Sequence, residues 1–119
     1  MMSLKKTFGN ALRGLWLYIS GETNNRVHLS AVVLVIAAGI IFHINVVEWL
    51  FLVVAIGLVL TSEAFNFSLE KLCDEVQSAY SERIRIVKDI SAGAVLIAAI
   101  ISAVIGLIIF FPKVIGLLF

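Results

Sequence analysis

Charged residues are scarce in this sequence. Only 14% of its 119 residues are Asp, Glu, Lys or Arg, whereas 61% are hydrophobic. Soluble globular domains carry about a quarter charged and about half apolar residues, and a domain of this length could not bury so much apolar surface. A lipid bilayer is therefore the expected solvent for most of the chain. The formal net charge of only +1 also excludes the broad cationic face that a nucleic-acid-binding protein needs.

The sequence has one cysteine and one proline, and it has no glycine-rich phosphate-binding motif. Cys73 is the single cysteine, so no disulfide can form within the chain. Neither GxxxxGK(S/T) nor GxGxxG occurs, which excludes a Walker or Rossmann nucleotide site. His28 and His43 have no partner at metal-ligand spacing, so we interpret both as structural. Pro112 is the single proline and follows the last long apolar run, so we expect it to end that helix.

The sequence predicts an all-α integral membrane protein with a single domain over residues 1–119. Three apolar stretches favour transmembrane helices at about 28–45, about 46–63 and 90–111. The polar residues 43–48 form the expected turn between the first two. Helical spacing of apolar residues continues past the second span to about residue 76, beyond the bilayer. The third span is rich in Ala, Gly and Ser, which let helices approach closely in lipid.

An amphipathic helix is expected at about residues 3–20. Apolar side chains recur there at spacings of three and four, while Lys6, Asn10 and Arg13 occupy another face. Lysines together with Trp16 on such a helix favour a position on the membrane surface. Packing on a soluble core is the alternative, and it is disfavoured because the sequence has little soluble core.

Basic residues mark one side of the membrane. Three spans place on a common side all but one of the basic residues, namely Lys5, Lys6, Arg13, Arg26, Lys71, Arg83, Arg85 and Lys88. Only Lys113 lies opposite. The positive-inside rule makes the basic side the cytoplasm. Every acidic residue except Glu48 shares that side, so we expect the chemistry there.

A narrow polar stripe follows the second span. Glu63, Asn66, Glu70 and Asp74 lie at helical angles of roughly 0°, 300°, 340° and 20° when each residue turns by about 100°. Glu63 comes directly after the apolar run, at the bilayer boundary, where ionisable side chains are costly and usually functional. Glu70 and Asp74 are like charges four residues apart, which alone destabilises a helix by a few tenths of a kcal/mol. A divalent cation or a facing Lys or Arg side chain would remove that penalty. Ligands that are all oxygen atoms favour magnesium over zinc or copper.

A solvated acidic helix face is the alternative interpretation of these residues. We prefer it for Glu75 and Glu82, but it does not require a first carboxylate at the membrane boundary or an asparagine among acids. Lys88 begins the third span and could snorkel, pair with Asp74 or Asp89, or supply positive charge for a nucleotide phosphate. Glu22 is a lone acid in a turn, for which periodicity alone favours a helix cap or solvent contact.

The residues from Glu63 to Asp74 resemble the E-x-x-N…E-x-x-x-D signature of the prokaryotic diacylglycerol kinase and undecaprenol kinase family. The segment 88–95, KDISAGAV, is similar to its K-D signature at the expected separation. Upstream, residues 11–15 and the E-x-x-x-R turn at 22–26 resemble the family's surface helix and turn. The likeness covers nearly the whole chain, and residues 26–28, RVH, are closer to the branch that phosphorylates undecaprenol.

The resemblance implies a homotrimer in the bacterial cytoplasmic (inner) membrane that uses Mg-ATP at active sites on the cytoplasmic face. It implies that Glu63 is the general base that removes the proton from the lipid hydroxyl. It further implies that Asn66 orients the site and that Glu70 and Glu22 hold magnesium.

Further contacts come from the resemblance alone. Asp74 would support Lys88. The implied ATP contacts are Asn10, Glu22, Glu70, Tyr80, Ser81, Lys88 and Asp89, and the implied lipid contacts are Glu63 and Arg13. Two positions depart from the family pattern: Ser81 follows Tyr80 where a histidine is usual, and Asn10 stands where an aromatic residue is common.

The sequence therefore favours an ATP-dependent kinase that phosphorylates a hydroxyl of undecaprenol or diacylglycerol, with the choice between these lipids left open. The alternative is a non-enzymatic three-helix subunit or channel whose acidic residues are merely solvated. A lipid phosphatase is disfavoured, because the sequence lacks the basic run and the histidines expected for phosphate binding.

Overall fold

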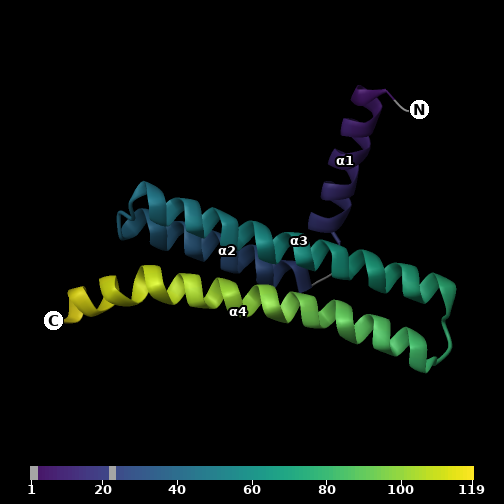
Figure 1. Cartoon of the computed structure of the whole chain (residues 1–119). Coiled ribbons are helices and arrows are strands. Elements are labelled where there is room, and N and C mark those ends of the chain that lie inside the picture. Colours follow the sequence, from purple (N-terminus) through teal and green to yellow (C-terminus); the bar gives the residue numbers. More distant parts are fainter. Residues whose placement is uncertain (1–2, 22–23) are drawn as a thin grey trace. The chain divides into compact units, whose positions relative to one another are not determined.

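The computed structural model describes residues 3–21 and 24–119, and this part of the chain is helical throughout apart from its connections. The four helices are α1 (Leu4–Ile19), α2 (Asn24–Ile41), α3 (Val46–Val76) and α4 (Glu82–Leu118) (Figure 1). The predicted all-α class is confirmed. The chain divides into two packed units, Met1–Leu34 and Val35–Phe119, which are described separately.

Helix α1 begins where a side chain caps it. The Ser3 hydroxyl accepts a hydrogen bond from the Lys6 backbone N–H, which otherwise has no partner in the first turn. The helix ends at Ile19, one residue before the end expected from the apolar spacing. Its large apolar side chains, including Phe8 and Trp16, are exposed within the described chain. A position on the membrane surface stays a prediction.

The turn between α2 and α3 is fixed by two capping motifs. His43 has a φ of 52°. Around it, the N–H groups of His43 and Ile44 donate to the carbonyls of Ile40 and Gly39, which is the Schellman arrangement. Asn45 and Glu48 then form a capping box at the start of α3. The expected tight turn between the two apolar stretches is present, and His43 has the structural role expected of it.

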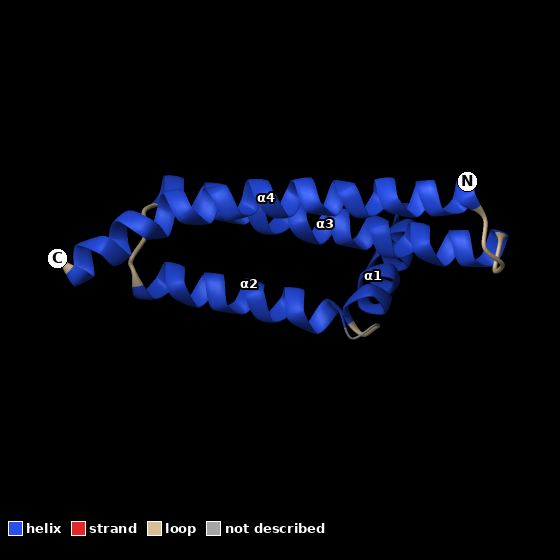
Figure 2. Cartoon of the chain, turned by 90° about the horizontal axis from the view of Figure 1, so that it is seen from below, coloured by secondary structure: helices blue, strands red, loops and turns tan. Residues whose placement is uncertain are grey.

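Helices α3 and α4 run side by side and antiparallel, joined by residues 77–81 (Figures 1 and 2). Small side chains line the seam between them: Ala55 on α3 is 3% exposed and Ala98 on α4 is 2% exposed. The Ser102 hydroxyl donates to the Ala55 carbonyl across the seam at 3.0 Å. At Ala98 and Ser102, small residues of the third predicted span therefore allow the expected close approach. Nothing described lies within 4 Å of a Cβ atom placed on Gly93 or Gly106.

Pro112 does not end the last helix, so that prediction is wrong. Helix α4 continues through Pro112 to Leu118, and its axis bends in its yellow C-terminal part (Figure 1). Proline removes one N–H bond and crowds the preceding turn, which kinks a helix, but helices in apolar surroundings tolerate it because the remaining backbone groups still need partners. The Nζ atom of Lys113, the next residue, lies 2.6 Å from Oε2 of Glu48 on α3, and this ion pair fixes the segment after the bend.

Two helices, α3 and α4, are long and apolar enough to cross a membrane. Within α2 the apolar stretch Arg26–Ile41 is shorter. The 18 residues of α2 extend about 27 Å at 1.5 Å per residue, close to the roughly 30 Å of a bilayer core. Crossing by α2, and with it the three-span topology, stays a prediction.

Gly39 on α2 lies close to Trp49 and Ile44 at the turn between α2 and α3. A Cβ atom there would lie 2.7 Å from Cη2 of Trp49 and 3.1 Å from Cδ1 of Ile44. We predict that Gly39→Ala lowers the thermal unfolding midpoint in detergent, because the indole must move, at a cost of about 1–3 kcal/mol. Gly14→Ala on α1 is the control, since nothing described lies within 4 Å of its added methyl. Equal midpoints for both variants would contradict the packing described.

Candidate active site

The predicted stripe lies on one continuous helix. Glu63, Asn66, Glu70 and Asp74 all belong to α3, which continues without a break to Val76. Glu63 and Asn66 are half-buried, whereas Glu70 and Asp74 are exposed. Glu63 and Glu70 are two turns apart, about 10 Å along the axis at 1.5 Å per residue. The stripe therefore leads from a partly buried carboxylate to exposed ones.

Lys88 joins this stripe from α4. Its Nζ lies 2.7 Å from Oδ1 of Asp74 and donates a hydrogen bond to it. That bond raises the pKa of Lys88, and the charges of Asp74 and Glu70 act in the same direction. Of the partners considered for Lys88, the structure shows Asp74 and not Asp89. The ammonium group of Lys88 thus lies beside the carboxylate of Asp74 on α3.

Asn66 connects the stripe to an apolar groove. A groove of about 530 Å³ runs between α3 and α4, with Phe65, Asn66 and Leu69 on one side and Ile90 and Ser91 on the other. Asn66 is the stripe residue that lines it. The Oδ1 atom of Asn66 is buried and has no hydrogen-bond partner among the described residues. Buried amide oxygens are nearly always bonded, so this acceptor is available to a ligand.

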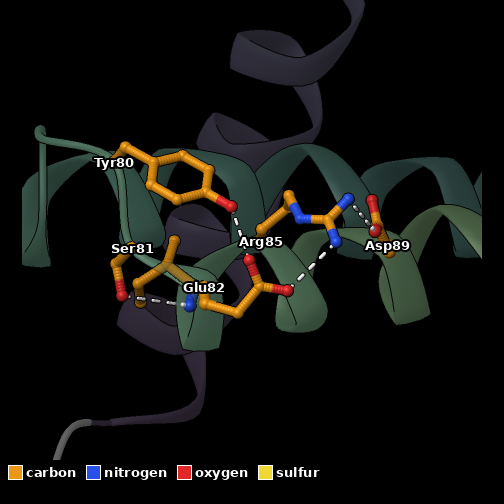
Figure 3. A network of polar contacts seen from close by, with 6 residues as sticks. Tyr80, Ser81, Glu82, Arg85 and Asp89 are labelled. Atoms are coloured by element: carbon orange, nitrogen blue, oxygen red, sulfur yellow. Dashed lines mark hydrogen bonds and ion pairs between the residues drawn. The ribbon is translucent and has the colours of Figure 1, made fainter.

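A chain of polar contacts surrounds the start of α4 (Figure 3). The Tyr80 hydroxyl donates to Oε2 of Glu82, and Arg85 Nη2 donates to Oε1 of the same carboxylate at 3.0 Å. The other terminal nitrogen of Arg85 lies 3.7 Å from Oδ2 of Asp89. The bond to Tyr80 and then that to Arg85 lower the pKa of Glu82. Ser81 is the N-cap of α4, where its hydroxyl accepts from the Ile84 N–H.

Comparison with known proteins decides the family. The model of the family described as prokaryotic diacylglycerol kinase matches residues 9–110. The chain belongs to the prokaryotic diacylglycerol kinase family. Its relatives include the undecaprenol kinase of Bacillus subtilis (strain 168), 33% identical over 108 residues, which cover 91% of this chain and 88% of the relative. The diacylglycerol kinase of Synechocystis sp. (strain ATCC 27184 / PCC 6803 / Kazusa) is 32% identical over 117 residues, which cover 98% of this chain and 67% of that protein.

For this family member, the structure brings some predicted site residues together and leaves others apart. Asp74 and Lys88 meet, and Tyr80 and Asp89 are linked through Glu82 and Arg85. Asn10 and Arg13 lie on α1 in the first unit, which is not placed relative to α3 and α4. The predicted metal ligand Glu22 lies outside the described residues. The roles of these residues stay predictions.

Two features of this diacylglycerol kinase family member were missed by sequence reasoning. Glu82 was interpreted as merely solvated, and it is exposed, but it accepts bonds from two neighbours. Glu82, Arg85 and Asp89 are spaced by three and four residues, and oppositely charged side chains at these spacings on a helix are neighbours. That spacing predicts the network. The ion pair of Glu48 with Lys113 joins residues far apart in sequence, and no local pattern indicates it.

The contact between Tyr80 and Glu82 has a spectroscopic consequence. Ionisation of Tyr80 would break its hydrogen bond and place a phenolate beside a carboxylate, so Glu82 raises the pKa of Tyr80. We predict that Glu82→Gln shifts the absorbance titration of Tyr80 to lower pH. Tyr18→Phe serves as the background, so that Tyr80 is the single tyrosine observed. Glu75→Gln is the matched control and leaves the titration in place. An unchanged midpoint in Glu82→Gln would show that the contact is absent in solution.

Proposed function

We propose that this chain is an ATP-dependent lipid kinase that phosphorylates a hydroxyl group of a membrane lipid. The observation that carries the proposal is the 2.7 Å contact of Lys88 with Asp74. It places a cation at the carboxylate stripe of a helix long and apolar enough to cross the membrane. Phosphoryl transfer depends mainly on positioning and on neutralising phosphate charge, and these residue types supply both. Family membership supports the same conclusion.

The lipid hydroxyl meets the stripe at its partly buried end. Glu63 follows the apolar part of α3 and is half-buried, so a lipid can reach it without leaving the bilayer. The adjoining groove is apolar over most of its surface and suits a hydrocarbon chain. Asn66 lines that groove with an unpaired carbonyl oxygen, which can accept a hydrogen bond from a hydroxyl group. The lipid contact of Arg13 is part of the same proposal.

The transfer itself is a single displacement. Glu63 takes the proton as the lipid oxygen attacks the γ-phosphorus of ATP, and the bond from that phosphorus to the bridging oxygen breaks, leaving ADP. Lys88 neutralises charge on the phosphates, and Asp74 holds Lys88 in place. Tyr80 and Asp89 contact the nucleotide, together with Ser81 and Asn10.

Magnesium fits the donors present. Among the described residues no group of three His, Cys, Asp or Glu side chains could hold a metal ion. Magnesium does not require one, since it is usually bound by one or two carboxylates together with substrate phosphates and water. Glu70 has an exposed carboxylate of the right chemistry, and Glu22 is the proposed second ligand. The ion would neutralise phosphate charge in the transition state.

We further propose that α2, α3 and α4 cross the bacterial inner membrane and that three copies of the chain assemble. With this topology, the connection 77–81 and the exposed end of the stripe lie on the cytoplasmic side. The large apolar side chains left exposed along all three helices, such as Leu34, Phe51 and Ile97, support burial in lipid or against other copies.

The direct test is transfer of labelled phosphate from ATP to a lipid by the purified protein, with undecaprenol and diacylglycerol offered in parallel. We predict that Glu63→Gln lowers kcat by about 10²- to 10⁴-fold, because the general base is lost. Glu75→Gln, an equal change at an exposed position of α3, keeps parental activity.

Two results would contradict the kinase proposal. One is a parent protein that labels neither lipid, which would favour the non-enzymatic three-helix subunit or channel. The other is a Glu63→Gln variant as active as its parent. Preference for one lipid identifies the substrate, since the two relatives are named for different lipids.

Magnesium dependence tests the role of Glu70. We predict that a chelator abolishes transfer and that added Mg²⁺ restores it. In Glu70→Gln the Mg²⁺ concentration for half-maximal activity rises several-fold, because a charged oxygen ligand is lost. Glu75→Gln is the control and keeps the parental requirement. An unchanged requirement in Glu70→Gln would remove Glu70 from the metal site.

A further inference from the structure

The network at the start of α4 links two residues with proposed nucleotide contacts through two residues without such an assignment. Tyr80 and Asp89 are the proposed contacts, and Glu82 and Arg85 lie between them (Figure 3). Each oxygen of the Glu82 carboxylate has its own donor, one from Tyr80 and one from Arg85. Each terminal nitrogen of Arg85 has its own carboxylate, Glu82 at 3.0 Å and Asp89 at 3.7 Å. The contacts therefore connect Tyr80 to Asp89 through Glu82 and Arg85, and Arg85 also interacts directly with Tyr80.

This arrangement is typical of positioning rather than of folding. Arg85, Glu82 and Asp89 are more than half exposed, and exposed ion pairs contribute little to stability. The guanidinium is a planar fork that holds two carboxylates in a defined geometry. Side chains ordered in this way before a ligand arrives lose less conformational entropy when it binds.

Charge supports the same role. Glu82 and Asp89 are seven residues apart and lie on the same face of α4. Without Arg85, two carboxylates about 10 Å apart along α4 would add negative charge beside the proposed position of the nucleotide phosphates. With Arg85 between them, part of that repulsion is removed.

We propose that Glu82 and Arg85 are positioning residues for the nucleotide, which act by holding Tyr80 and Asp89 in place. This inference rests on the proposed kinase function. It adds a second contribution from α4 to the site. Lys88 binds Asp74 in the stripe of α3, whereas Arg85 holds Glu82 and Asp89 on α4 and, through Glu82, Tyr80 in the preceding connection.

The test measures KM for ATP, KM for the lipid, and kcat for Arg85→Ala, Arg85→Lys and Glu82→Gln. We expect Arg85→Ala to raise KM for ATP by about three- to tenfold, the range that ordering one or two side chains corresponds to. The kcat value and KM for the lipid stay close to parental. Arg85→Lys recovers part of the loss, because a lysine can bind only one of the two carboxylates. Glu82→Gln also raises KM for ATP.

The matched control is Arg83→Ala, which removes the same charge from an exposed neighbouring position outside the network. It is expected to keep the parental KM for ATP. Combining Arg85→Ala with Glu82→Gln is expected to be no worse than the more severe single change, because both break the same chain. The dissociation constants for ATP, measured by equilibrium dialysis, are expected to rank the variants in the same order as their KM values. This measurement does not depend on phosphoryl transfer to a lipid.

Three outcomes would overturn the inference. These are an unchanged KM and dialysis affinity in Arg85→Ala, an equal loss in Arg83→Ala, or a parallel fall of kcat and thermal midpoint in both Arg85 variants. The last result would show a purely structural role. A parent protein that binds ATP with the predicted ranking but labels no lipid would instead contradict the proposed kinase function alone.

Discussion

The short connection between α3 and α4 is the constraint on which the rest of the second unit depends. Residues 77–81 allow no crossover, so the two helices must run back along each other. Small residues then let the backbones approach, and Ser102 bonds to the carbonyl of Ala55 across the seam. With that register set, the last turns of α3 and the first turns of α4 lie opposite each other. Asp74 and Lys88 meet for this reason, although they are separated in sequence by the whole connection.

Helix α3 carries both a long apolar stretch and the residues of the proposed site. Helix α3 begins with a capped turn at Asn45, continues through an apolar stretch and ends in an acidic segment without a break. Because a helix is rigid, the position of Glu63 relative to Glu70 is fixed by the rise per residue. One end of the stripe therefore adjoins an apolar groove while the other is exposed. A lipid alcohol requires apolar surroundings, and a charged phosphoryl donor requires exposed ones. This arrangement agrees with the membership of the chain in the prokaryotic diacylglycerol kinase family.

Local patterns predicted much of the fold and less of the site. Apolar periodicity predicted α1 and the full length of α3, because both depend on spacing along one helix. The expectation that Pro112 ends a helix is wrong. It considers only the hydrogen bond that proline removes, whereas the neighbouring backbone groups still need partners in apolar surroundings, and a continued helix supplies them. The sequence alone does not decide whether Lys88 pairs with Asp74 or Asp89, because that choice depends on the register of α3 against α4. The pair of Glu48 with Lys113 could not be predicted for the same reason.

In the proposed site Asp74 acts by holding Lys88 in place, and a double-mutant cycle measures whether the two residues are coupled in this way. The measurement is kcat/KM for ATP in the parent, in Asp74→Asn, in Lys88→Gln and in the double variant. If Asp74 works by holding Lys88, the double variant is no worse than Lys88→Gln, and the two losses do not add. Losses that multiply would contradict the account, because they would show that Asp74 and Lys88 act independently.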